Sequence, residues 1–205
     1  KTEHIRSVTN ELLRYDTRAS LGQFMTSKSI CSLMSSMFND MSGNINILDA
    51  GAGIGSLTAS LVQRACKEES VENISSYTIE CDETMLEGLA STILSCAEES
   101  KKNDKPFNYE VFDEDFIEFS VKQLFTNGNT KYSFNKAILN PPYVQIKSNS
   151  KERLLLRKAG IETGNLYSGF VALAIKMLDV GGELVAITPR SFCNGPYFSA
   201  FRELI

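Results

Sequence analysis

The sequence has 205 residues, of which 42% are hydrophobic and 22% are charged, and its formal net charge is −4. This length and balance are typical of a soluble globular protein with one large α/β domain and a sizeable core. The acidic balance argues against binding nucleic acid through overall charge, so any such contact must come from a local patch or from protein outside this sequence.

The sequence offers little for metal or histidine chemistry. Its five cysteines have no CxxC spacing and are interpreted as reduced thiols of a cytoplasmic protein without a metal site. The single histidine, His4, argues against histidine-based acid–base catalysis. No apolar run approaches a membrane span and no signal peptide is visible, so we expect no membrane partner. Because the chain begins at Lys1, we interpret it as part of a longer protein.

The N-terminal region is predicted to form two helices joined by a loop. Residues 1–20 form a polar helical segment, which we separate from a main domain at 21–205. A Gly-Gln-Phe-Met-Thr loop follows, and Ser27 is predicted to cap a helix over 28–40. The apolar stripe of that helix is assigned to the core and consists of Ile30, Leu33, Met34, Met37 and Phe38.

A glycine-rich loop follows the first predicted strand, at 46–49. The strand runs into Asp49-Ala50-Gly51-Ala52-Gly53-Ile54-Gly55, and a helix is predicted after it. This arrangement is typical of dinucleotide or adenosyl binding at the first crossover of a parallel sheet. The GxGxG spacing, without Gly-Lys-Ser/Thr, weakens the pyrophosphate and P-loop readings. Asp49 at the strand end adds a carboxylate suited to an ammonium group or a water.

Acidic residues also follow the second and third predicted strands. The second, at 76–79 after a polar insert at 67–75, ends at Glu80, which is placed to accept both hydroxyls of a ribose. Asp82 competes for that role, and a solvated acid is a third reading. A helix over 83–100 leads to the third strand at 107–112.

The third strand is followed by Asp113-Glu114-Asp115-Phe116. An Asp-Phe pair at this place suits an adenine ring, with the carboxylate on the amino group and the phenyl ring beside the base. The alternative is that Asp113 or Asp115 only caps the next helix.

A fourth strand, at 134–139, runs directly into Asn140-Pro141-Pro142-Tyr143. The prolines end the strand and leave a stiff loop, because they lack an N–H and fix φ. Such a loop suits an exocyclic amino group, whose lone pair is delocalised into its ring. The Asn140 side-chain oxygen and the Pro141 carbonyl are suited to accept its N–H bonds, and Tyr143 to stack on the ring. The structural alternative is a simple proline turn.

The C-terminal third combines a basic segment with one more strand. Residues 144–164 carry a local excess of positive charge that suits phosphate contacts, although a solvated helix face over 151–158 explains it equally well. A helix over 164–181, a fifth strand over 183–188 and a helix from 197 are predicted next. The candidate phosphate contacts are Lys147, Lys151, Arg153, Arg157 and Lys158.

The order of these motifs resembles one protein family. The Gly-Gln-Phe-x-Thr loop, the Asp-x-Gly-x-Gly-x-Gly loop, the later acids and Asn-Pro-Pro-Tyr resemble the adenine-N6 DNA methyltransferases of the gamma class, the TaqI-like group of restriction–modification systems. The segments at 165–170, 181–184 and 188–192 also look like that group, and the similarity covers about 18–205. It implies an α/β, Rossmann-like S-adenosylmethionine-dependent methyltransferase fold with a mainly parallel sheet of order 3-2-1-4-5.

The resemblance also implies roles for individual residues. S-adenosylmethionine would be the cofactor, with its ribose on Glu80. A target adenine in double-stranded DNA would be flipped out, held by Asn140 and Pro141, and stacked on Tyr143 beside Pro142. No metal is needed for direct displacement at the methyl group. The residues placed around the cofactor, from its methionine end to its adenine ring, are Phe24, Thr26, Asp49, Gly51, Gly53, Glu80, Asp115 and Phe116.

One departure from the family concerns the C-terminus. The family's domain continues through two more strands and a target-recognition domain, whereas this sequence stops in the helix after the fifth strand. We therefore expect the fifth strand at a sheet edge that another segment or chain covers, and weak sequence-specific DNA binding.

Three other functions stay open from the sequence. An RNA-base or protein-glutamine methyltransferase would use the same Asn-Pro-Pro-Tyr site on a similar amino group. A catalytically silent module that binds S-adenosylmethionine or DNA is a second alternative, although the intact motif argues against a dead site. An NAD-dependent dehydrogenase fits the glycine loop and Glu80 but leaves Asn-Pro-Pro-Tyr unexplained.

Overall fold

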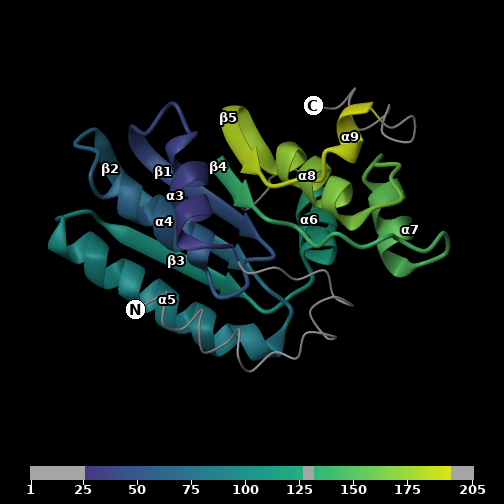
Figure 1. Cartoon of the computed structure of the whole chain (residues 1–205), viewed down its shortest axis with the longest axis horizontal. Coiled ribbons are helices and arrows are strands. Elements are labelled where there is room, and N and C mark those ends of the chain that lie inside the picture. The colour runs from purple at the N-terminus through teal and green to yellow at the C-terminus, as the bar shows by residue number, and fades with distance from the viewer. Residues whose placement is uncertain (1–25, 127–131, 195–205) are drawn as a thin grey trace.

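The computed structural model describes residues 26–126 and 132–194 of the chain (Figure 1). Phe24, the predicted segment at 1–20 and the predicted helix from 197 lie outside the described residues. The described part contains a five-stranded parallel sheet of order β3-β2-β1-β4-β5, which confirms the predicted strand order. The strands are β1 (Gly43–Ala50), β2 (Val71–Ile79), β3 (Phe107–Phe112), β4 (Phe134–Leu139) and β5 (Leu178–Ala186).

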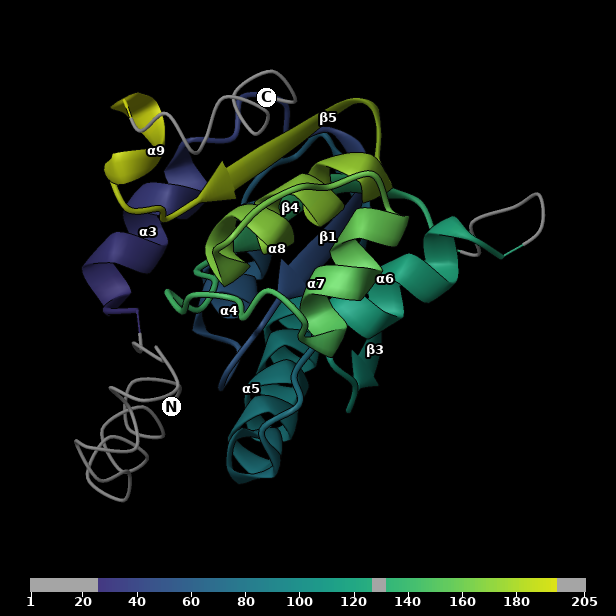
Figure 2. The same ribbon diagram turned by 90° about the vertical axis from the view of Figure 1, so that its right-hand side faces the viewer.

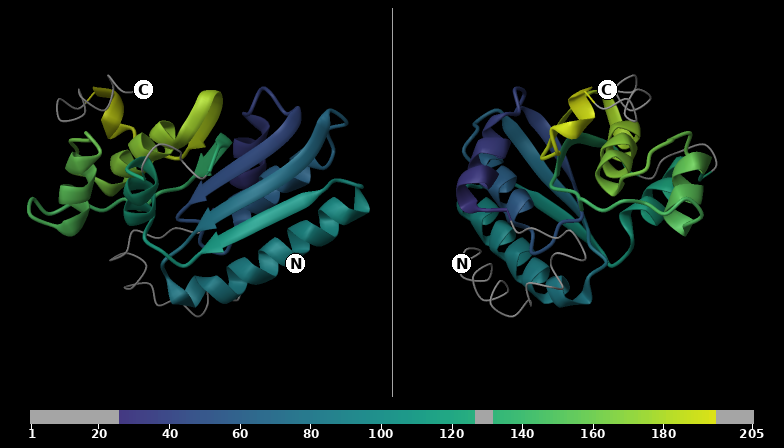
Figure 3. Two further views of the ribbon diagram at one scale, coloured as in Figure 1. Left: turned by 180° about the vertical axis from the view of Figure 1, so that it is seen from behind. Right: turned by 45° about the vertical axis from the view of Figure 1, so that its right-hand side comes forward.

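Helices cover both faces of this sheet, as Figures 2 and 3 show. One face packs against the first three helices and the other against the fourth and sixth, whereas the fifth helix packs against the fourth. Successive residues of β1 point to opposite faces of the sheet. Ile47 belongs to the hydrophobic cluster on the side of the first three helices, and Leu48 to the cluster on the other side. The helices are α3 (Lys28–Ser36), α4 (Ser56–Ala65), α5 (Glu83–Lys102), α6 (Phe116–Leu124), α7 (Lys151–Lys158), α8 (Leu166–Met177) and α9 (Ser191–Asn194).

Three predicted strands begin earlier than expected. β1 starts at Gly43 and not at 46. β2 starts at Val71, so the second half of the supposed polar insert at 67–75 belongs to the sheet. β5 starts at Leu178, and the glycine pair that was predicted to end a helix lies inside it. The physical reason is that Gly181 has a φ of 83° and the pairing of β4 with β5 shifts register there, so the glycines form an irregularity in the strand.

The prediction of which face of α3 is buried was wrong for three of its five residues. Met34 and Phe38 are buried as expected, but Ile30, Leu33 and Met37 are 43%, 61% and 58% exposed. The helix turns a different face inward, which it builds from Cys31, Met34 and Ser35. The helix ends at Ser36, so the residues after it no longer follow helical spacing.

We expect Gly55→Ala to destabilise the fold by about 2–4 kcal/mol, because left-handed backbone and overpacking costs add. Gly55 is the N-cap of α4 with a φ of 78°, and a Cβ there would lie 2.8 Å from Leu89 Cδ1. Gly43→Ala is the matched control, since its φ is 62° but a Cβ would meet nothing within 4 Å. Urea denaturation should show a loss of only about 1–2 kcal/mol for that control. Equal losses would contradict the packing part of this argument.

No helix in the described ranges is long and apolar enough to cross a membrane. The same ranges contain no group of three or more His, Cys, Asp or Glu side chains that could hold a metal ion.

Candidate active site

The carboxyl ends of β1 and β4 define the place where a ligand site is expected. These strands are neighbours, and the chain proceeds from β1 towards β3 on one side and from β4 to β5 on the other. In open parallel sheets, ligands bind outside the carboxyl ends of the strands at such a reversal. The glycine loop follows β1 and the Asn-Pro-Pro-Tyr loop follows β4, so the fold brings the two strongest sequence motifs to the same edge of the sheet.

The glycine loop folds back over the end of β2. Gly51 and Ala52 donate their N–H groups to the Ile79 carbonyl at 2.9 and 3.1 Å. Gly51 and Gly53 have φ angles of 71° and 56°, which only glycine adopts without strain. A Cβ at Gly53 would meet nothing within 4 Å, so this side of the loop is open to a ligand.

Asp49 is a fully buried carboxylate at the end of β1. Its Oδ2 accepts hydrogen bonds from the backbone N–H and hydroxyl of Thr58 at 3.2 and 2.7 Å, which ties β1 to the first turn of α4. Its Oδ1 is also buried and has no hydrogen-bond partner among the residues described. Burial raises the pKa of Asp49 to about 7, against the lowering effect of the Thr58 bonds and with a further rise from the Glu80 charge.

This raised pKa predicts a specific pH dependence of stability. Between about pH 4 and 7 the folded protein holds a proton on Asp49 that the unfolded chain releases. The free energy of unfolding should therefore fall as the pH rises through this window. The isosteric variant Asp49→Asn cannot titrate at this position, so its free energy of unfolding should fall less over this window. Urea denaturation at several pH values should therefore give a flatter profile than in the wild type. Parallel profiles for the two proteins would contradict the assignment.

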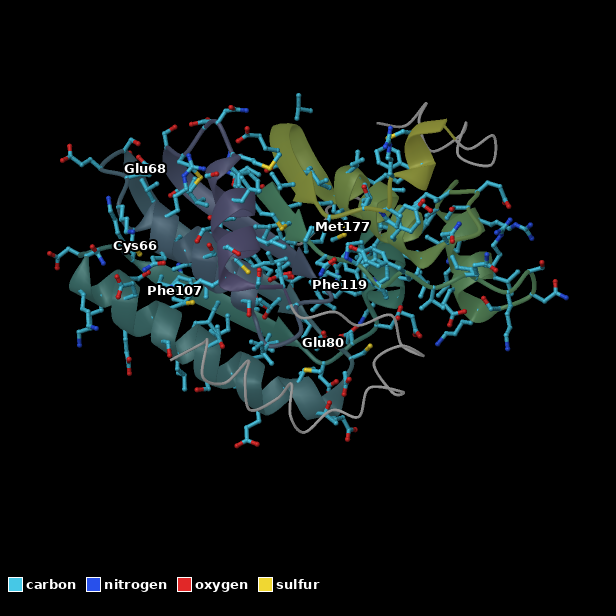
Figure 4. The ribbon with its side chains drawn as sticks, in the orientation of Figure 1. Cys66, Glu68, Glu80, Phe107, Phe119 and Met177 are labelled. Carbon is cyan, nitrogen blue, oxygen red and sulfur yellow. The ribbon has the colours of Figure 1, made fainter. Side chains whose placement is uncertain are left out.

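Glu80, which is labelled in Figure 4, directly follows β2 and holds the glycine loop in place. Its Oε2 accepts the Gly53 N–H at 2.7 Å, and its Oε1 accepts the N–H groups of Cys81 and Asp82 at 2.9 and 2.8 Å. The side chain is almost fully buried, and burial raises the pKa of its carboxyl group despite these bonds. The sequence did not reveal this structural role, which couples the carboxylate to the loop.

Asp82, the competing candidate, has a different position. Its Oδ1 accepts hydrogen bonds from the backbone N–H and hydroxyl of Thr84 at 3.0 and 2.6 Å, which makes it the N-cap of α5. Of the two acids, Glu80 is therefore the one bonded to the glycine loop.

Asp115 and Phe116 start α6, and the structure supports the capping interpretation of the pair. Asp115 accepts the Glu118 N–H at 3.0 Å as N-cap, and burial raises the pKa of its carboxyl group. Phe116 is only 2% exposed, and its ring packs against that of Phe170 with centroids 5.0 Å apart. In this conformation Phe116 offers little surface to a ligand, so its place beside an adenine ring stays a prediction.

The Asn140 side chain is bonded at both ends. Its Nδ2 donates to Thr26 Oγ1 at 3.1 Å, and its Oδ1 accepts the Tyr143 hydroxyl at 2.6 Å. The Tyr143 hydroxyl also lies 3.3 Å from the Ile187 carbonyl, so the site reaches to the end of β5. Pro141 is buried and Pro142 partly buried, which anchors the loop. The family resemblance implied a cofactor contact for Thr26, and nothing in the sequence indicated its hydrogen bond with Asn140.

A short antiparallel contact supports the Asn-Pro-Pro-Tyr loop from α8. Leu166 donates its N–H to the Val144 carbonyl at 2.9 Å, and Ile146 donates to the Gly164 carbonyl at 2.8 Å. The Tyr143 ring meets the Tyr167 ring edge-on with centroids 6.3 Å apart. The start of α8 therefore supports the loop that follows β4.

The basic residues beyond the site are largely ion-paired. Lys151 contacts Glu118, and Arg153 and Arg157 both contact Glu162. Lys147 is exposed. These pairs favour the interpretation of a solvated helix face for α7, and a role in phosphate binding stays a prediction.

The sheet order, the glycine loop and the loop after β4 together define a Rossmann-like fold of the class I methyltransferase type. Residues 22–205 match the model of the Eco57I restriction-modification methylase family, and the chain belongs to that family.

Sequence comparison finds two similar type II methyltransferases. The chain is 48% identical over 201 residues to M.PstI from Providencia stuartii, and 46% identical over 203 residues to M.BsuBI from Bacillus subtilis. The matches cover 98% and 97% of this chain, but the chain spans only 39% of the length of each relative.

Two solved structures share the fold at low sequence identity. A protein from Listeria monocytogenes assigned to the class I S-adenosylmethionine-dependent methyltransferases matches with a TM-score of 0.63 and 13% identity, over 99% of this chain and 58% of that one. The methyltransferase subunit of a type I restriction-modification system from Streptococcus thermophilus matches with a TM-score of 0.63 and 16% identity, over 88% of this chain and 38% of that one.

Proposed function

We propose that the chain is the catalytic part of an S-adenosylmethionine-dependent DNA methyltransferase of the gamma class. It transfers a methyl group to the N6 amino group of a flipped-out adenine, in the cytoplasm and as part of a restriction–modification system. The observation that carries this proposal is the meeting of the glycine loop and Asn140-Pro141-Pro142-Tyr143 at the β1–β4 reversal of the sheet. Membership of a restriction-modification methylase family supports DNA as the acceptor.

The residues after β1 and β2 fit the proposed cofactor. S-adenosylmethionine supplies an electrophilic methyl group on a positively charged sulfur. The buried Oδ1 of Asp49, which lacks a partner among the residues described, suits a cationic ligand at the end of β1. Glu80 keeps the glycine loop in the conformation that exposes Gly53, and its remaining acceptor capacity suits a ribose hydroxyl.

The loop after β4 supplies the groups that act on the target amino group. Asn140 Oδ1 and the Pro141 carbonyl accept its two N–H bonds, which favours a tetrahedral nitrogen with an available lone pair. The Tyr143 ring stacks on the base and stabilises the positive charge that develops there. Because these dipoles are in place before the reaction, they lower the barrier without reorganising in its course. As the new N–C bond formed, the bond between the sulfonium sulfur and the methyl carbon would break and S-adenosylhomocysteine would leave. The extra proton would then pass from the nitrogen to solvent.

Product analysis tests this proposal. The full natural protein is incubated with methyl-labelled S-adenosylmethionine and adenine-containing duplex DNA, and the nucleosides are then separated by mass. We expect label only in N6-methyladenine, and none when RNA or a glutamine-containing peptide replaces the DNA. Label in N4-methylcytosine would overturn the base assignment, and label only in RNA or peptide would overturn the acceptor. No label in any acceptor would favour a silent binding module.

A further inference from the structure

The hydrogen bond between Asn140 and Thr26 joins two distant parts of the chain. The two residues are 114 positions apart, and their side chains meet at 3.1 Å beside the loop that follows β4. Thr26 directly precedes Ser27, the N-cap of α3. The contact therefore connects the N-terminal loop of the domain to the side chain that the proposed function places on the target amino group.

An asparagine side chain needs such a partner to hold one orientation. The torsion that rotates the amide plane is broad and nearly two-fold, so it does not fix the plane by itself. Only the oxygen of the amide accepts a hydrogen bond, whereas the nitrogen donates two. A half-turn of the Asn140 amide would present N–H groups to the amino group of the target, which also donates. The reaction therefore depends on keeping the nitrogen end turned away.

Thr26 is well placed to hold that end, because its own backbone is anchored. Its carbonyl accepts the Cys31 thiol at 3.7 Å, and the neighbouring Ser27 carbonyl accepts the Cys31 N–H at 2.9 Å. Cys31 is buried on the inner face of α3, which packs against α4. At the other end of the amide, the Tyr143 hydroxyl donates to the Asn140 oxygen at 2.6 Å.

We propose that Thr26 is a positioning residue, which fixes the Asn140 amide with its oxygen turned to the target amino group. This inference rests on the proposed function and deepens it. It differs from the role that the sequence suggested for Thr26, a contact with the methionine end of the cofactor. A cofactor contact would change cofactor affinity, whereas a positioning contact changes the rate of methyl transfer.

Three variants separate these roles. Thr26→Val keeps the shape of the side chain but removes the acceptor, and Thr26→Ser keeps the acceptor. Ser27→Ala is the control, because it removes a neighbouring hydroxyl that lies 3.1 Å from that of Ser29. For each variant of the full natural protein, the single-turnover rate of methyl transfer to duplex DNA and the affinity for S-adenosylmethionine are measured. Exchange of the Asn140 side-chain amide protons, followed by NMR, reports the hydrogen bond without any substrate.

We expect Thr26→Val to lower the single-turnover rate by roughly 10–100-fold with cofactor affinity within about 3-fold of the wild type. Thr26→Ser should restore the rate, and Ser27→Ala should leave it unchanged. The Asn140 amide protons should exchange roughly 10-fold faster in Thr26→Val only. A loss of cofactor affinity that accounts for the whole loss of rate would overturn the inference, as would a wild-type rate in Thr26→Val. If the wild-type protein methylates no acceptor, the proposed function fails, and the exchange rates alone decide whether Thr26 holds the amide.

Discussion

Replacing Asn140 by alanine is expected to lower methyl transfer by at least about 10²–10³-fold, which is the size of effect seen when one preplaced dipole is lost from an active site. The side chain supplies one of the two acceptors for the target amino group in the proposed mechanism, and alanine cannot replace it. Cofactor affinity should stay within a few-fold, because Asn140 contacts Thr26 and Tyr143 and follows β4, whereas the glycine loop follows β1. Single-turnover rates and calorimetric affinities measure the two effects separately.

The control for this variant is Asn108→Ala, an exposed asparagine on β3 that lies next to Asn73. It should leave both the rate and the affinity unchanged. If Asn140→Ala weakened cofactor binding as much as it slowed the reaction, Asn140 would belong to the cofactor site and not to the target site.

Replacing Glu183 by alanine is expected to lower the free energy of unfolding by about 3–5 kcal/mol, because it leaves a buried ammonium group without its partner. Lys136 is 3% exposed, and its Nζ donates to Glu183 Oε2 at 2.7 Å across β4 and β5. Glu183 also accepts the backbone N–H groups of Asn39 and Asp40 at 2.8 and 3.2 Å. It therefore fastens the segment after α3 to the edge strand. Urea denaturation of both proteins gives the difference.

The same carboxylate predicts loss of stability in acid. Burial by itself would raise the pKa of Glu183, but hydrogen bonds from Lys136, Asn39 and Asp40 outweigh it and lower that pKa to about 2. Because this pKa is lowered in the folded protein, ionised Glu183 contributes fully to the free energy of unfolding above pH 4.5, the ordinary pKa. That contribution is lost as the pH falls towards 2. Glu183→Gln should therefore lose less stability than the wild type over this window.

Glu68→Ala provides the comparison for Glu183→Ala. Glu68 pairs with Arg64 on α4 at 3.7 Å, and its side chain is 42% exposed. Its loss should cost less than about 1 kcal/mol. Similar losses at both positions would show that the Lys136–Glu183 pair does not hold the sheet edge as described.

The positions of the strands could be predicted because short apolar runs are separated by glycine and proline signals, whereas their order in the sheet was predicted from the resemblance to the methyltransferase family. The β3 and β4 boundaries were predicted correctly, since Phe107–Phe112 and Phe134–Leu139 are bounded by proline or polar residues. The starts of β1, β2 and β5 were missed, because polar residues and glycines occur inside those strands. The inward face of α3 was missed because spacing alone does not say which of two adjacent apolar faces meets a neighbour.

Only those parts of the site that consist of residues adjacent in the sequence could be predicted. The loops at Asp49 and Asn140 each follow a strand, and parallel strand order alone brings them together. Contacts between distant side chains left no local signal. The sequence did not reveal that Glu80 holds Gly53, that Thr26 holds Asn140, or that Lys136 pairs with Glu183.

Calorimetric titration of the full natural protein with S-adenosylmethionine, with NAD as the control ligand, tests the proposed cofactor site most directly. We predict one-to-one binding of S-adenosylmethionine with a dissociation constant on the order of micromolar, and no heat from NAD. Binding of NAD in its place would mean that the glycine loop and Glu80 serve a dinucleotide. Binding of neither ligand would contradict the assignment of the loops after β1 and β4 as a methyl-transfer site.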